Sequence, residues 1–112
     1  DKLKQRNAAA ANYVHSLDSA CMIKTVNIAK QKGVNSFCNV HDSFATHACD
    51  IDILNQSIRE AFVETFSKDL FTKFREDVAL LLPEEAKSKL PATPETGELE
   101  LDLLHQSKFF FA

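Results

Sequence analysis

The chain has 112 residues, 45% of them hydrophobic, with few glycines and prolines, which is the composition of one globular domain and excludes a disordered or fibrous class. With a net charge of −3, the chain lacks the overall basic character of a self-sufficient nucleic-acid-binding domain. Three cysteines, at 21, 38 and 49, without paired spacing favour a reducing compartment. No apolar run approaches the roughly 20 residues that span a bilayer, so no membrane association is expected.

The N-terminal third predicts helix in two pieces. Residues 1–11 are good helix formers without an apolar stripe, and residues 12–17 are expected to be irregular. Asp18 is a plausible N-cap for a second helix, in which apolar residues recur at helical spacing from 22 to 29. Gly33 is a natural end for that helix.

A short hairpin is predicted next, because residues 36–40 and 43–46 are β-prone and only His41 and Asp42 separate them. Asp50 can then cap a long helix with one apolar face, and a second helical pattern extends from about 70 to 81. Pro83 ends it and opens a short helix, and a loop and an aromatic-rich tail follow. The predicted class is α+β: mostly helical with one β-hairpin.

The hairpin tip is the place where the sequence points to chemistry. A carboxylate there is held by a rigid ladder and still projects outward, and Mg²⁺ is usually held by one or two carboxylates plus substrate phosphates. Two-metal phosphoryl transfer needs ions about 3.5–4 Å apart and carboxylates from separate elements, of which Asp42 supplies one. Taken alone, a His-Asp-Ser triplet is more often an ordinary turn.

Four stretches of the sequence favour a catalytic role for Asp42 over an ordinary turn. Residues 12–18 read NYVHSLD, residues 40–50 read VHDSFATHACD, residues 55–63 read NQSIREAFV, and residues 97–112 end in Phe-Phe-Ala. In order and spacing they resemble the H-S-x-D box, the motif C hairpin, the following N-x-x-x-R-E helix and the C-terminal foot of single-subunit, phage- or mitochondrial-type DNA-directed RNA polymerases. Any one box is weak, but the four together cover nearly the whole chain.

The resemblance implies that residues 1–112 are the C-terminal fragment of the polymerase palm region, including the foot. The start at Asp1, inside a helix-forming stretch, also suggests a cut within a longer protein. Asp42 would be a catalytic metal ligand, with Mg²⁺ as cofactor. The parent nucleotidyltransferase would make RNA from nucleoside triphosphates on a DNA template, together with the rest of its own chain. Its expected location is the bacterial cytoplasm, as a phage or prophage product, with the mitochondrion as the alternative.

Further roles follow by position in the family. His15, His41 and Ser43 would lie beside the RNA 3′ end and the hybrid, and Phe111 and Ala112 would form the C-terminal foot near the catalytic centre. The chain departs from the family pattern at two places, where Cys21 replaces a usual histidine and Ala45 replaces a glycine common in phage members. The first departure puts the hydrogen bonding near the hairpin in question.

The polymerase parts that the sequence lacks are equally informative. Neither glycine follows an aspartate, so the Asp-Gly box that carries the second metal ligand in the family is missing, as is the fingers helix with its Tyr-Gly. One palm segment cannot position template, nucleotide and both metals. The chain by itself is therefore expected to be inactive.

Other interpretations remain open. A non-enzymatic interaction domain could use the hairpin and the aromatic tail to bind a protein, and Phe109 to Phe111 could form an exposed, self-associating patch. A small nuclease would need a second acid near Asp42. A zinc set of Cys38, His41, His47 and Cys49 is disfavoured, because structural zinc sites prefer closely spaced cysteine pairs. Four phenylalanines at helical spacing are expected in the core: Phe62, Phe66, Phe71 and Phe74.

Overall fold

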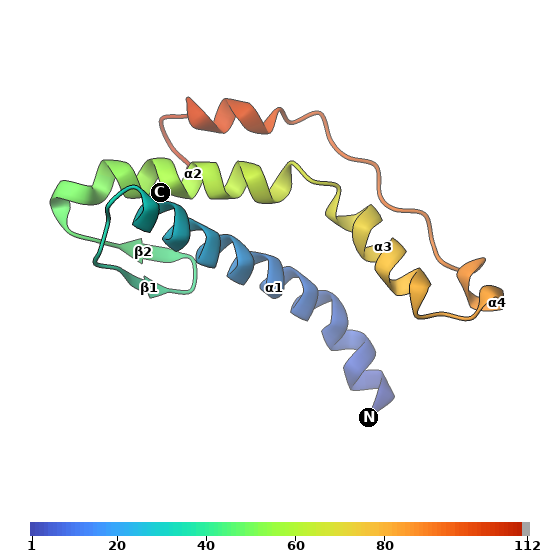
Figure 1. Cartoon of the computed structure of the whole chain (residues 1–112). Coiled ribbons are helices and arrows are strands. Elements are labelled where there is room, and N and C mark those ends of the chain that lie inside the picture. The colour runs from blue at the N-terminus through green and yellow to red at the C-terminus, as the bar shows by residue number, and fades with distance from the viewer. Residues whose placement is uncertain (111–112) are drawn as a thin grey trace.

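The computed structural model describes residues 1–110 and confirms the α+β class, mostly helical with one hairpin. In chain order its elements are α1 (Lys2–Gln31), β1 (Cys38–Val40), β2 (Ser43–Ala45), the 3-10 helix η1 (Ala48–Asp50), α2 (Ile51–Phe66), α3 (Leu70–Leu80), α4 (Glu84–Lys87) and the 3-10 helix η2 (Leu101–His105). The helices α1 and α2 lie side by side and run in opposite directions, and the hairpin lies beside them (Figure 1).

The helix α1 is continuous, so the predicted irregular segment at 12–17 and the helix start at Asp18 are wrong. Its N-cap is Asp1, whose carboxylate accepts from the backbone N–H groups of Leu3 (3.0 Å) and Lys4 (3.4 Å). Residues 12–17 include neither glycine nor proline, and strong helix formers precede them. A tertiary contact also holds this stretch, because the Tyr13 hydroxyl donates to the Leu70 carbonyl of α3 at 3.1 Å.

The end of α1 confirms the stop at Gly33. Gly33 has a positive φ of 101°, its N–H donates to the Lys30 carbonyl, and the N–H of Val34 donates to the Ala29 carbonyl. These are the two bonds of a Schellman motif, in which the residue after the glycine packs back on the helix. Val34 and Ala29 are fully buried together, so the turn that ends the helix also begins the core.

The core lies where α1, α2 and the hairpin meet. Ala29, Val34 and Leu54 form its buried cluster, with Phe37 and Phe44 of the hairpin region packed against it. Small side chains let the two helices approach closely, and the buried hydroxyls along this face donate to carbonyls of their own helices, which satisfies them without water. They belong to Thr25, which donates to Cys21, and Ser57, which donates to Ile53.

The hairpin is confirmed, with strands slightly shorter than predicted. The antiparallel register pairs Cys38 with Ala45 and Val40 with Ser43, which leaves His41 and Asp42 as a two-residue loop. Loops of this length need a residue with positive φ, and His41 has φ 54°.

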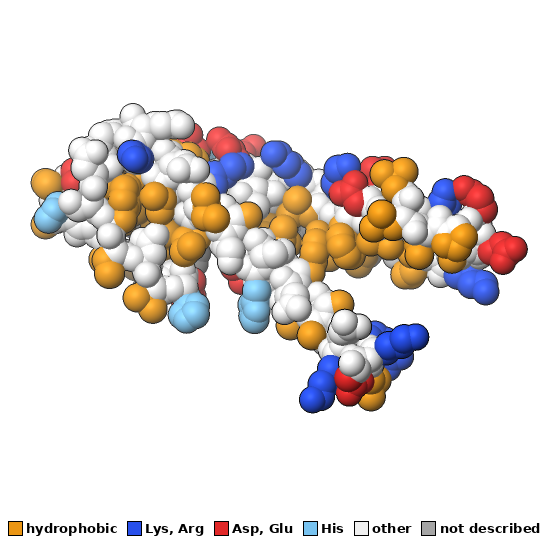
Figure 2. Space-filling view, turned by 60° about the horizontal axis from the view of Figure 1, so that its bottom comes forward, with side chains coloured by type: hydrophobic (Ala, Val, Ile, Leu, Met, Phe, Trp, Pro, Cys, Tyr) orange, Lys and Arg blue, Asp and Glu red, His pale blue; other side chains and the backbone are white. Residues whose placement is uncertain are grey.

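The C-terminal half is less buried than predicted. The Tyr13 ring packs on Phe74 and Phe71 at centroid distances of 4.5 and 6.1 Å, yet these phenylalanines stay 48% and 53% exposed. The prediction that both belong to the core is therefore wrong in residues 1–110, whereas Phe62 and Phe66 are partly buried. Hydrophobic side chains are exposed along much of the molecule (Figure 2). No helix in the described part of the chain is long and apolar enough to span a membrane.

Candidate functional site

Asp42 occupies the tip of the hairpin, where the two-residue loop holds it between paired strands. Its side chain is exposed and has no hydrogen-bond or ion-pair partner among residues 1–110. A carboxylate in this position is acceptor-only and available to a cation or to a donor outside the chain. Two hollows of the surface adjoin it.

The larger hollow has a volume of about 820 Å³ and lies between α1, the hairpin and α2. It brings together His15 from α1 with His41 and Asp42 from the loop, three of the four residues that the sequence suggested for nucleic acid or metal. Its apolar wall includes Phe44, Phe62, Phe66, Met22 and Ile58. The hollow therefore combines polar and apolar side chains, as is common in ligand sites.

Ser43, the fourth predicted residue, borders a separate hollow of about 330 Å³ with Asp42 and Asn55. Asp42 thus lies between the two hollows, and Ser43 does not join the histidines. Phe111 and Ala112, predicted as the foot near this site, lie outside the described residues.

Asp18 and Asn39 are among the polar residues of the larger hollow that were not predicted as site residues. Asp18 lines it from α1, where the sequence suggested only a helix cap, and Asn39 lines it from β1. The Asn39 side-chain oxygen is buried without a hydrogen-bond partner in the described part of the chain. The signal for Asp18 was present, because His15 and Asp18 are three residues apart and share one face of a continuous helix.

The side chains around the hairpin tip supply only some of the ligands that a metal ion needs. Within residues 1–110, no group of three or more His, Cys, Asp or Glu side chains is placed to bind an ion. Mg²⁺ is held by one or two carboxylates and keeps several waters or substrate phosphates as further ligands. Asp42 fits one position of such a site.

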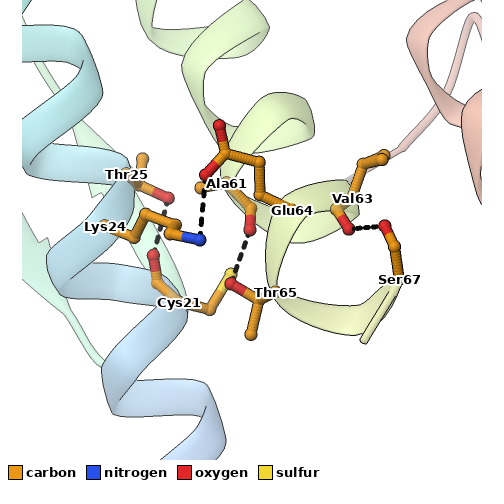
Figure 3. Close-up of polar contacts among 8 residues, drawn as sticks. All are labelled: Cys21, Lys24, Thr25, Ala61, Val63, Glu64, Thr65 and Ser67. Atoms are coloured by element: carbon orange, nitrogen blue, oxygen red, sulfur yellow. Dashed lines mark hydrogen bonds and ion pairs between the residues drawn. The ribbon is translucent and has the colours of Figure 1, made fainter. Parts of the chain in front are cut away.

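Cys21, which stands where the family usually has histidine, lies against α2. Its thiol is half-buried and lies against the Thr65 hydroxyl, and the neighbouring Lys24 forms an ion pair with Glu64 at 2.9 Å (Figure 3). Burial raises the pKa of the Cys21 thiol, and the nearby Asp18 carboxylate adds to this, whereas Thr65 and Lys24 oppose it. The thiol therefore stays protonated at neutral pH, as part of the contact between the two helices.

The N-x-x-x-R-E stretch of α2 has a structural part that the sequence did not reveal. Arg59 is 7% exposed; its Nε donates to the Asn55 side-chain oxygen at 2.9 Å and its NH1 group donates to the Leu104 carbonyl of η2. Glu60 forms an ion pair with Lys32 at the end of α1. The motif thus ties α2 both to α1 and to the C-terminal segment.

Comparison with known proteins agrees with the motifs. A family model described as DNA-dependent RNA polymerase matches residues 1–89. The chain is 41% identical over 108 residues to the Arabidopsis thaliana DNA-directed RNA polymerase 2, chloroplastic/mitochondrial, covering 96% of the chain and 10% of that relative. It is 38% identical to the Arabidopsis thaliana DNA-directed RNA polymerase 1, mitochondrial, with 96% and 11% covered.

A third relative is shorter. The Nicotiana tabacum DNA-directed RNA polymerase 1A is 37% identical over 108 residues, which are 96% of the chain and 67% of that relative. The chain spans about a tenth of the length of the Arabidopsis relatives. From the family model, these identities and the motifs around Asp42, we conclude that the chain belongs to the family of single-subunit, phage-type DNA-dependent RNA polymerases.

Proposed function

We propose that the chain is the C-terminal part of the palm region of a single-subunit RNA polymerase, and that the complete enzyme makes RNA from nucleoside triphosphates on a DNA template. In this proposal Asp42 is the catalytic carboxylate that the chain contributes. The observation that carries it is the position of Asp42: an exposed carboxylate without a partner in residues 1–110, at the tip of a two-residue loop, beside a hollow lined by His15 and His41.

Asp42 would hold Mg²⁺ together with a carboxylate from another part of the polymerase. When bound, Mg²⁺ supplies charge neutralisation at the phosphates and lowers the pKa of the attacking hydroxyl. The chain's own part is to fix one ligand on a paired hairpin and to offer two imidazoles beside it. His15 and His41 would donate hydrogen bonds to the RNA 3′ end, and Ser43 would contact the hybrid from the smaller hollow.

The chain alone would be inactive. A second metal-binding carboxylate, the nucleotide-binding helix and the template channel all have to come from the rest of the polymerase, because positioning and electrostatic stabilisation supply most of the rate in phosphoryl transfer. The partners of the complete enzyme would be DNA, the RNA product and nucleoside triphosphates.

An organellar location fits the relatives better than a phage or prophage origin in a bacterium. The names of the two Arabidopsis relatives place them in mitochondria, and one of them also in chloroplasts. We therefore favour the mitochondrial alternative of the sequence analysis for this chain.

The test is Asp42→Asn in the complete polymerase, which removes one charge and keeps the shape. Template-dependent RNA synthesis should fall about a thousandfold, because charge stabilisation by a bound metal is worth several kcal/mol. The matched control is Asp52→Asn, the same change at an exposed acid in the first turn of α2. Its activity should stay normal. If the polymerase with Asp42→Asn kept its activity, the proposal would be overturned, and the interpretation of this chain as a non-enzymatic interaction domain would be favoured.

A further inference from the structure

Arg59 is a nearly buried cation without an acidic partner in residues 1–110. Its donors go to a side-chain amide of its own helix and to a backbone carbonyl of η2, 45 residues further along the chain. Burying a guanidinium against neutral acceptors costs free energy that a well-packed apolar residue would not cost. The burial of Arg59 is therefore explained better by the groups that it holds in place than by a gain in the stability of the fold.

The group that it holds is the end of the described chain. The guanidinium lies over the Phe110 ring, 5.4 Å from its centroid, while the same side chain donates to Leu104. A planar cation can do both at once, because its donors point outward in the plane and its face stacks on an aromatic ring. Arg59 therefore fastens the C-terminal segment to α2 at two points, and η2 lies along α2 as a result (Figure 1).

This fastening reaches the large hollow through aromatic contacts. The Phe110 ring meets Phe62 edge-on, at a centroid distance of 5.0 Å and an interplanar angle of 81°. Phe62 packs on Phe66 at 4.5 Å, and both rings line the hollow that Asp42 borders. A contiguous path of packed side chains thus connects Arg59 to the wall of the candidate site.

We propose that Arg59 is a positioning residue for RNA synthesis, and this rests on the proposed function. It does not touch the reacting groups. It holds Phe110 against Phe62 and so fixes the aromatic wall of the hollow in which the RNA end would lie. Asn55 orients the guanidinium by accepting from Nε at 2.9 Å.

The test uses the complete polymerase with Arg59→Gln, Arg59→Lys, Phe110→Ala, and Arg59→Gln combined with Phe110→Ala. The kcat of Arg59→Gln should fall about ten- to a hundredfold, because misplacement of about 1 Å can cost that much, while the KM for nucleoside triphosphates stays near its normal value. Arg59→Lys should recover only part of the loss, since an ammonium cannot stack and fork as a guanidinium does. The double variant should be no worse than the more impaired single variant, because both changes break one path.

A second readout follows the tail itself. Lys108 is exposed and lies two residues before Phe110, so trypsin should cut after it faster in Arg59→Gln than in the parent enzyme. Glu60→Gln is the matched control: it breaks the neighbouring ion pair with Lys32, Glu60 has no hydrogen bond or ion pair to the tail within residues 1–110, and the change should leave both kcat and cleavage unchanged.

A normal kcat in Arg59→Gln, or additive losses in the double variant, would overturn the role of Arg59. If Arg59→Gln does not fold, Phe110→Ala decides alone: a normal kcat or unchanged cleavage at Lys108 overturns the proposal. The two proposals fail in different ways. Full synthesis by Asp42→Asn removes the proposed function, whereas loss in Asp42→Asn together with normal Arg59→Gln removes only the inference about Arg59.

Discussion

The surroundings of Cys21 lower the reactivity of its thiol. Its thiol is half-buried against Thr65, and burial raises its pKa, whereas Cys38 and Cys49 are exposed. Because the thiolate is the reactive form, a thiol reagent at about pH 8 should label Cys21 much more slowly than the other two. Mass spectrometry of the labelled peptides measures this, with Cys21→Ser as the control that loses the slow phase. Equal rates at the three cysteines would contradict the packing of Cys21 against α2.

Residue by residue, the sequence predicted the position of a side chain where a motif marked it, and missed it where only the packing of the elements places it. Asp42 and His41 stand in a recognisable hairpin, so their place at its tip could be predicted. Asn39 could not, because its part in the hollow depends on how α1, β1 and α2 meet in space. Arg59 was visible in a motif, but its burial depends on a carbonyl 45 residues away.

Among the elements, the end of α1 depends most strictly on one residue type, because its last turn needs a residue with positive φ. Gly33 has φ 101°, and a Cβ added there would meet no atom within 4 Å, so the cost of Gly33→Ala is backbone strain alone. A side chain in this region costs about 1–2 kcal/mol, and thermal unfolding should show a correspondingly lower Tm. Gly33→Asn should cost less, because asparagine tolerates positive φ better than alanine. An alanine variant as stable as the parent would show that the Schellman turn is absent.

The elements that were predicted correctly are marked by local sequence signals, whereas α1 was predicted in two pieces because a tertiary contact holds its middle part in the helix. The hairpin and the stop at Gly33 follow from turn chemistry. Residues 12–17 have only moderate propensity, and their helix is held by Tyr13 reaching the Leu70 carbonyl of a helix far along the chain. Propensity alone therefore could not predict that the two pieces are one helix.

As a whole molecule, the chain is more open than a compact domain of its size. Its accessible surface is 8891 Å², against about 6,200 Å² for a folded monomer of this mass. Its radius of gyration is 17.6 Å, against about 13 Å for a compact chain of this length. Leu80 and Leu81 are 81% and 86% exposed, which is apolar surface that a larger protein would cover.

The isolated chain should therefore have a free energy of unfolding below about 5 kcal/mol, the lower end for ordinary domains. Urea unfolding followed by circular dichroism measures this value, and the transition should be broad because little surface becomes newly exposed. A steep transition with the stability of a typical domain would contradict this expectation and show that the long α1–α2 pair is sufficient by itself.

The hairpin register has one more consequence, which concerns chain length and not residue type. Between Val40 and Ser43 the loop has two residues, and Phe44 alone of β2 turns inward to the core. A codon gained or lost here forces a different turn, or slips the pairing and turns Phe44 outward. Either way Asp42 leaves its place, so an insertion or deletion that keeps Asp42 in the sequence would be as damaging as replacing it.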